Sequence, residues 1–152
     1  MSWSIEGLHI VSMQERHLDA LASLERLCFS IPWSREGLAA ELSEPTACFQ
    51  VAEYKGQTIG YAGMHVIVDE AYITNVAVDP NCRRHGAGRL LLQALERSAI
   101  SRGAATLSLE VRVTNQEAIR LYHACGFQEV GVRKGLYEQP KEDGLIMTKV
   151  FI

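Results

Sequence analysis

Apolar and polar residues follow two different rhythms along this chain, and each rhythm predicts one kind of element. From Ala104 to Val113 apolar and polar side chains alternate, which predicts a strand with one apolar face. From Asn115 to Cys125 apolar residues recur three and four positions apart, which predicts an amphipathic helix. Gly126 follows at the position where a left-handed helix C-cap belongs. The chain therefore contains a strand and a helix joined by a very short connection.

The remaining elements follow the same rhythms and predict an α/β fold built on a mixed sheet. Further strands are expected over residues 8–13, 49–54, 58–68, 70–78, 128–133 and 145–151, and further helices over residues 16–28, 34–42 and 86–102. The polar stretch 134–144 is expected to form a loop. Strands come first and then alternate with helices, an order that favours a mixed sheet with flanking helices. Since the chain has no repeat and no break in composition, residues 1–152 are expected to form a single domain.

A short basic loop between an apolar strand and a leucine-rich helix has the composition of a pyrophosphate site. Gly86 and Gly88 open the helix without a Cβ that would keep a phosphate away, and helix N-termini bind anions. Arg83, Arg84 and Arg89 add charge and hydrogen-bond donors. The segment lacks both the Gly-Lys-Ser/Thr of a Walker loop and the third glycine of a dinucleotide fingerprint. A glycine-relaxed loop before an ordinary helix is the alternative at this point.

Two motifs of this chain resemble those of the GCN5-related N-acetyltransferases (GNAT). The arginine at 83 with glycines at 86 and 88 resembles their Gln/Arg-x-x-Gly-x-Gly/Ala signature. The residues from Leu109 to Tyr122, followed by Gly126-Phe127, resemble their second acetyl-CoA motif. The combination Leu-Glu-Val-Arg, Asn, Leu-Tyr and Gly-Phe resembles the RimI-type branch, the bacterial ribosomal-protein-alanine N-acetyltransferases. The segment Ile31-Pro32-Trp33-Ser34 is similar to the Phe-Pro-Trp-Ser of that branch, so the resemblance runs from about Leu27 to the C-terminus.

The resemblance implies a fold and a co-substrate. It implies a mostly antiparallel sheet in which one central parallel pair, the strands 70–78 and 104–113, splays apart around the pantetheine arm of acetyl-CoA. His85 is expected to offer only its backbone N–H, and Asn115 can cap a helix and bond the cofactor arm at once. The cofactor-binding residues that the resemblance implies are Val76, Ala77, Val78, Arg83, Arg84, His85, Gly86, Ala87, Gly88, Arg89 and Asn115.

Acetyl transfer from a thioester to an amine requires a base for the amine and an acid for the leaving thiolate. An α-amine has a pKa near 7.7–8.0 and a lysine near 10.4, so deprotonating a lysine at pH 7 costs about 3–4 kcal/mol more. A modest base is therefore enough for a protein N-terminus. The resemblance implies Glu110 as this base, at a position expected to be partly desolvated, and Tyr122 as the acid. Residue type alone favours Glu110 as a solvated surface carboxylate and Tyr122 as a core aromatic, and the two motifs reverse that preference.

The acceptor follows less directly from the residues. The resemblance implies that Trp33 and Tyr137 line the acceptor groove, although Trp33 can also be a core anchor. Glu138, Glu142 and Asp143 either favour a basic residue after the acceptor's N-terminus or form a solvated acidic loop. The leading hypothesis is an enzyme that acetylates the N-terminal alanine of a small-subunit ribosomal protein. Alternatives are a protein lysine, a polyamine or another small amine as acceptor, or a non-catalytic acyl-CoA-binding module.

Bulk properties limit the remaining partners. The net charge of −3 argues against broad nucleic-acid binding, and no apolar run approaches the length of a membrane span. The four cysteines have neither C-x-x-C pairing nor histidines at metal-ligand spacing, which favours reduced thiols and no metal site. The N-terminal residues lack the pattern of a signal segment. We expect a cytoplasmic enzyme with acetyl-CoA and a protein N-terminus as its partners.

Overall fold

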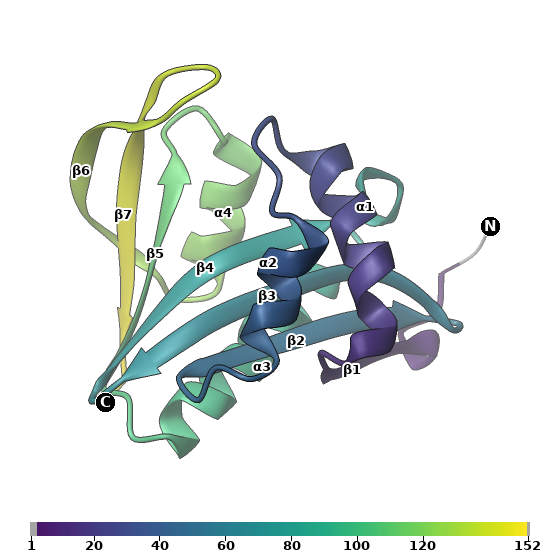
Figure 1. The fold of residues 1–152 in the computed structure, drawn as a ribbon. Coiled ribbons are helices and arrows are strands. Elements are labelled where there is room, and N and C mark those ends of the chain that lie inside the picture. Colours follow the sequence, from purple (N-terminus) through teal and green to yellow (C-terminus); the bar gives the residue numbers. More distant parts are fainter. Residues whose placement is uncertain (1–2, 152) are drawn as a thin grey trace.

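A seven-stranded sheet with one parallel pair organises the computed structural model, which describes residues 3–151 (Figure 1). The strand order is β1-β2-β3-β4-β5-β7-β6, and only β4 and β5 pair in parallel. This confirms the expected mixed, mostly antiparallel sheet. The strands are β1 Leu8–Ser12, β2 Ala47–Tyr54, β3 Gln57–Ile67, β4 Glu70–Val78, β5 Thr106–Arg112, β6 Gln128–Tyr137 and β7 Glu142–Val150.

Two helices cover each face of the sheet (Figure 1). Ser34 caps the second helix by accepting a hydrogen bond from Gly37 N at 3.0 Å, as its position in the sequence suggests. Asn115, rather than a capping box beginning at Thr114, caps the last helix by accepting from Ala118 N at 3.2 Å. The Thr114 hydroxyl instead donates to Glu142. The helices are α1 Leu18–Cys28 and α2 Arg35–Glu41 on one face, and α3 Ala87–Ser101 and α4 Gln116–Ala124 on the other.

The parallel pair is short, and this shortness opens the sheet. Within the described residues, β4 and β5 pair only from Glu70 with Thr106 to Tyr72 with Ser108, although both strands continue beyond that point. A register shift in β4, which leaves Thr74 without a β3 partner, lies just past the last parallel pair. The two strands therefore diverge, as the resemblance implied.

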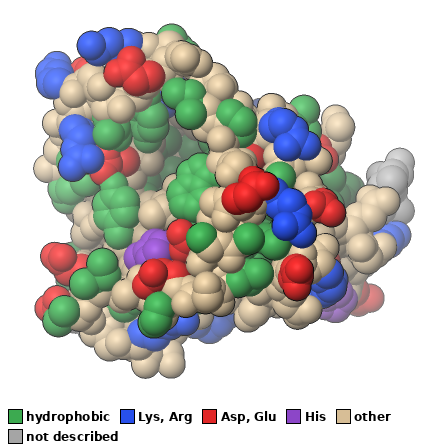
Figure 2. All heavy atoms as spheres, viewed as in Figure 1, with side chains coloured by type: hydrophobic (Ala, Val, Ile, Leu, Met, Phe, Trp, Pro, Cys, Tyr) green, Lys and Arg blue, Asp and Glu red, His purple; other side chains and the backbone are tan. Residues whose placement is uncertain are grey.

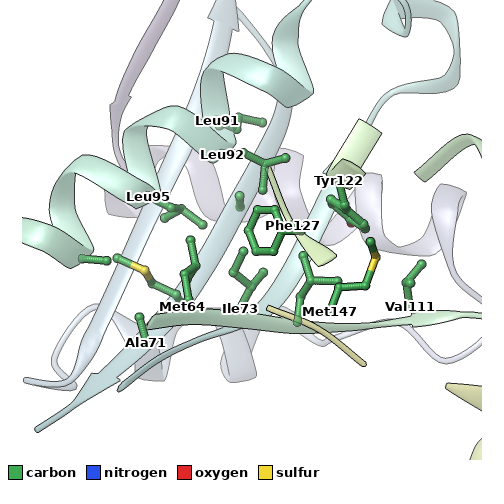
Figure 3. Close-up of a cluster of buried hydrophobic side chains, with 14 of the residues drawn as sticks. Met64, Ala71, Ile73, Leu91, Leu92, Leu95, Val111, Tyr122, Phe127 and Met147 are labelled. Carbon is green, nitrogen blue, oxygen red and sulfur yellow. The ribbon is translucent and has the colours of Figure 1, made fainter. Parts of the chain in front are cut away.

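Two apolar clusters stabilise the sheet. One lies where β4 and β5 are paired, here called the closed end, and the other lies on the face under α1. On the α3 and α4 face, Leu91, Leu95 and Phe127 pack with Met64 and Ile73 (Figure 3). Each such side chain contributes about 1.5–3 kcal/mol when it is fully buried. On the opposite face, α1 packs on β2 and β3 in a second cluster. The closed end is thus fixed by packing, whereas the diverging end is free to form a site.

The expected loop over residues 134–144 was wrong in extent. β6 continues to Tyr137 and β7 begins at Glu142, so only a four-residue turn lies between them. β6 is an edge strand, and its polar side chains stay in solvent while β7 supplies its backbone partners. In addition, the Asp143 carboxylate accepts a hydrogen bond from Gly135 N at 2.8 Å. Because the side chains of β6 are mostly exposed, its sequence has the composition of a loop.

Over residues 3–151, no helix combines the length and apolar character that a membrane crossing requires.

Candidate functional site

Two clefts meet where β4 and β5 diverge. The first, here called the loop cleft, has a volume of about 550 Å³ and lies between the end of β4, the basic loop before α3, and α4. The second, the gap cleft, has a volume of about 610 Å³ and lies between β4, β5, the segment after α1 and the β6–β7 turn. Figure 2 shows this face hollowed between the β5–β7 side and the α1 side, with hydrophobic side chains in the hollow. Both clefts are lined by Cys28, Phe29, Val76, Asn115 and Tyr122.

The loop cleft gathers nearly all of the residues expected to bind the cofactor. His85 is the exception, because its ring stacks on Trp3 with the centroids 4.3 Å apart and leaves only its backbone near the loop. This arrangement agrees with the expectation that His85 offers no side-chain contact. The expected residues that line the cleft are Val76, Ala77, Val78, Arg83, Arg84, Gly86, Ala87, Gly88, Arg89 and Asn115.

Gly86 and Gly88 are required in the loop for different structural reasons. Gly86 is the N-cap of α3 with a φ of 92°, a left-handed conformation that favours glycine. Gly88 has an ordinary φ, but a Cβ there would lie 3.0 Å from Leu121 Cδ2 of α4. Gly88 therefore allows α3 and α4 to approach each other beside the cleft, in addition to leaving space for a ligand. The free N–H groups at the start of α3 make the loop a suitable anion site.

The arginines of the loop have different surroundings. Arg83 Nε donates to the Val78 carbonyl at 3.0 Å, so its guanidinium braces the end of β4. Arg84 is 82% exposed and lies 3.9 Å from Glu117, which leaves it free to turn toward an anion. Arg89, in the first turn of α3, also lines the cleft. The cleft therefore offers guanidinium groups beside a helix N-terminus, an arrangement suited to a pyrophosphate.

Glu110 lies in the gap cleft and is held by two neighbours. Its side chain is 10% exposed, and the Tyr72 hydroxyl donates a hydrogen bond to Oε1. A guanidinium nitrogen of Arg133 donates to Oε1 at 3.1 Å and to Oε2 at 3.3 Å. The aliphatic neighbours of Glu110 in sequence, Leu109 and Val111, belong to the apolar cluster on the other face. Glu110 is thus removed from water as expected, but its surroundings are polar and include a cation.

Tyr122 is both a cleft residue and a core residue. It is 6% exposed, packs edge-on against Phe127 with centroids 6.0 Å apart, and lines both clefts. Burial, the largest cause, raises the pKa of Tyr122 well above its ordinary value. The hydroxyl therefore keeps its proton at neutral pH and is available as a donor. The two interpretations of Tyr122 from the sequence, a core aromatic and a proton donor in the site, are therefore compatible.

Trp33 and Tyr137 lie on opposite rims of the gap cleft. The Trp33 ring also lies 6.4 Å from Phe49, so this residue helps to anchor the start of α2. The Arg112 guanidinium lies 4.5 Å from the centre of the Tyr137 ring. The Ser30 hydroxyl donates to the Gln139 carbonyl at 2.5 Å and joins the two rims. The cleft is therefore bounded by elements that are far apart in sequence.

A buried polar chain that sequence reasoning missed supports the gap cleft. The Glu25 carboxylate accepts from Trp33 N at 2.9 Å and from the Tyr61 hydroxyl at 2.7 Å. The Tyr61 oxygen in turn accepts from Asn75 Nδ2 at 2.9 Å. Burial raises the pKa of Tyr61, which keeps it a donor to Glu25. One signal was available, because Glu25 stands on the apolar face of α1, one turn after Leu21.

Comparison with known proteins identifies the family. A model of the acetyltransferase (GNAT) family matches residues 18–127. The chain belongs to the GNAT acetyltransferase family. This GNAT chain is 38% identical over 141 residues to the ribosomal protein bS18-alanine N-acetyltransferase of Escherichia coli strain K12. The matched region covers 91% of this chain and 95% of the relative. The chain is 34% identical over 144 residues to the enzyme of the same name from Haemophilus ducreyi, covering 91% of this chain and 97% of the relative.

Solved GNAT structures agree with the fold described above. The crystal structure of the ribosomal-protein-S18-alanine N-acetyltransferase from Escherichia coli has a TM-score of 0.86 at 34% identity, and covers 94% of this chain and 93% of that chain. Ard1 from Thermoplasma volcanium has a TM-score of 0.88 at 21% identity, covering 96% and 99%, and supports the fold alone. GNAT enzymes use acetyl-CoA, and this GNAT chain is an acetyltransferase.

Proposed function

We propose that this chain transfers the acetyl group of acetyl-CoA to the N-terminal α-amine of a protein, and that this protein is a small-subunit ribosomal protein with an N-terminal alanine. One observation carries the proposal. Glu110, whose side chain is 10% exposed, and the buried Tyr122 both line the gap cleft, and Tyr122 also lines the basic loop cleft. The names of the relatives, which specify ribosomal protein bS18-alanine, support this choice of acceptor.

The loop cleft holds acetyl-CoA in this proposal. Backbone N–H groups at the start of α3, with Arg84 and Arg89, receive the pyrophosphate. The edge of β4 at residues 76–78 offers backbone groups to the amides of the pantetheine arm, apart from the Val78 carbonyl, which already accepts from Arg83 Nε at 3.0 Å. Asn115, whose Oδ1 already caps α4, lines both clefts and contacts the arm near its thioester end.

The acceptor enters through the gap cleft between Trp33 and Tyr137. Glu110 takes a proton from the α-ammonium group, directly or through a water, and the free amine attacks the thioester carbonyl. Attack forms the new N–C bond and the C–S bond breaks, and the Tyr122 hydroxyl supplies the proton that the departing thiolate accepts. The second proton that the new amide nitrogen loses restores the Tyr122 hydroxyl, so the net proton released by the reaction is the one on Glu110. Because the α-amine is about 3–4 kcal/mol easier to deprotonate than a lysine at pH 7, a single carboxylate is a sufficient base.

Release of free thiol from acetyl-CoA tests the proposal with three acceptors. These are a peptide with a free Ala-Arg N-terminus, its N-blocked version with an internal lysine, and spermidine. We expect turnover of the free N-terminus alone, and a loss of at least about 100-fold in Glu110→Gln, since general bases contribute about 10²–10⁴-fold. Glu129→Gln is the matched control, because Glu129 is exposed on β6 and pairs with His123.

Each arm of this experiment can contradict the proposal. Turnover of the blocked lysine peptide or of spermidine would move the acceptor to another class of amine. Acetyl-CoA binding without turnover of any acceptor would identify an acyl-CoA-binding module. Full activity of Glu110→Gln would remove Glu110 as the base and leave the cofactor site unchanged.

A further inference from the structure

We infer that Arg133 is a positioning residue for Glu110, and that it holds this carboxylate in a fixed orientation, aimed into the gap cleft. The inference rests on the proposed function, since it takes Glu110 to be the base. Arg133 lies on the edge strand β6, and β7 separates that strand from β5. Its side chain is 59% exposed, whereas that of Glu110 is 10% exposed. The guanidinium therefore reaches from the surface across β7 to a buried carboxylate.

The hydrogen bonds to Glu110 leave room for an acceptor amine. The Tyr72 hydroxyl and Arg133 both contact Oε1, and Arg133 also bridges to Oε2 at 3.3 Å. A carboxylate offers about four lone-pair sites on its two oxygens. Oε2, which carries only the longer of the two Arg133 contacts, thus retains the capacity to accept an N–H from the substrate. The two neighbours fix the plane of the carboxylate without occupying it fully.

The other charged and titratable groups around Glu110 do not take the place of Arg133. Arg112 lies on the same strand but is engaged by Glu142 at 3.2 Å. Among the residues that the structure describes, Arg133 is the cation in ion-pair contact with Glu110. The groups that face the gap cleft or contact Glu110 are Glu25 from α1, Cys28 at the end of α1, Tyr72 from β4, Arg112 from β5, Tyr122 from α4, Tyr137 from β6 and Glu138 from the β6–β7 turn.

A cation in this position has a specific kinetic consequence. With Arg133 in place, two neighbours hold the Glu110 carboxylate, and its remaining lone pairs stay directed at the acceptor amine. When Arg133 is removed, the Tyr72 hydroxyl is the hydrogen-bond donor that remains among residues 3–151, and the carboxylate is free to take more orientations. The loss should therefore appear in the chemical step and not in the binding of acetyl-CoA, because Arg133 does not line the loop cleft.

The test compares the steady-state kinetics of Arg133→Met with those of Lys134→Met. Lys134 is the neighbouring residue on β6 and pairs with Asp143 at 3.4 Å, so its loss changes the net charge equally without touching Glu110. We expect kcat for the Ala-Arg peptide to fall by about 10- to 100-fold in Arg133→Met, because a misplaced reacting group costs up to about 10²-fold. The KM for acetyl-CoA should stay unchanged, Arg133→Lys should restore most of kcat, and Lys134→Met should keep the wild-type kcat.

Three results separate this inference from the proposed function. A kcat of Arg133→Met equal to that of the wild type, with Glu110→Gln inactive, would overturn the inference and leave Glu110 as the base. A loss of kcat that accompanies a lower melting temperature and is not restored in Arg133→Lys would reduce Arg133 to a structural role and overturn the inference as well. Activity of Glu110→Gln would overturn both, because Arg133 could then not act through that carboxylate.

Discussion

At the scale of single residues, this site relies on side chains that serve the core and the chemistry together. Tyr122 packs against Phe127 while it lines both clefts, and Glu110 is enclosed by Tyr72 and Arg133. Packing of this kind fixes rotamers, so a reactive group is held in place before a substrate arrives. A substitution that keeps the shape of the side chain but removes one polar atom can therefore separate its role in packing from its role in the chemistry.

Tyr122→Phe makes that separation. The ring and its contact with Phe127 remain, so we expect the melting temperature to change by no more than about 2 °C, as for a shape-conserving change. The proton donor is lost, and we expect kcat to fall by about 100-fold or more, with little change in the KM for acetyl-CoA. Steady-state kinetics and thermal unfolding of the same preparation check both halves. A variant that melts early and loses activity only in proportion would contradict a role as acid.

At the scale of elements, hydrogen bonds from β5 hold the β6–β7 turn on the acceptor rim. Arg112 donates to the Glu138 carbonyl at 2.9 Å and to the Pro140 carbonyl at 2.8 Å. Of the three acidic residues expected near this turn, two are occupied internally. Hydrogen bonds from Thr114 lower the pKa of Glu142, and the Gly135 N–H lowers the pKa of Asp143. Glu138, which lines the gap cleft, has its carboxylate available to the acceptor.

Glu138→Gln tests the contribution of the turn to acceptor choice. We expect the preference for arginine over alanine as the second acceptor residue to fall by about 2- to 5-fold in kcat/KM, the range of an exposed ion pair. Competition between the two peptides measures the ratio directly. Glu129→Gln, which changes an exposed carboxylate on β6 outside the gap cleft, should leave the ratio as it is. An unaltered ratio in Glu138→Gln would assign this residue to the solvated surface.

At the scale of the whole molecule, the sheet consists of two halves joined over a short length. β1 to β4 form one half, β5, β7 and β6 form the other, and three residue pairs of β4 and β5 connect them (Figure 1). The apolar cluster under α3 and α4 spans this junction. Because both halves share one core, we expect them to unfold together.

The pH dependence of unfolding should reflect carboxylates in both halves. Hydrogen bonds from Arg16 and His17 lower the pKa of Glu53 in β2, as Thr114 does for Glu142 in β7. Folded-state pKa values below those of the unfolded chain give stability that is present above about pH 4.5 and is lost as the pH falls further. We expect the melting temperature to fall between pH 5 and pH 3. In Glu53→Gln the fall should be smaller, and a fall as large as that of the wild type would exclude Glu53 as a contributor.

Much of the loop cleft could be predicted from the sequence, because all of its lining residues except Cys28 and Phe29 lie within two continuous segments. The rest of the site depends on strand order. β7, the last strand in the chain, lies between β5 and β6, and no local pattern predicts that Arg133 reaches Glu110 across it. Tyr72 and Glu110 face each other only because the parallel pair ends beside them. The extent of β6 was missed because an exposed edge strand has the composition of a loop.

The divergence of β4 and β5 has a consequence for self-association. Unpaired strand edges at the border of a sheet invite pairing with other chains. Here an unpaired edge, that of β4 from residue 74 onward, lies in the interior of the sheet order, with β5 beyond it. A foreign strand would have to thread between two covered halves to reach it, whereas a slender unbranched molecule can lie along it. The molecule thus keeps backbone hydrogen-bonding groups accessible to a slender ligand without the risk of aggregation that such groups bring at a sheet border.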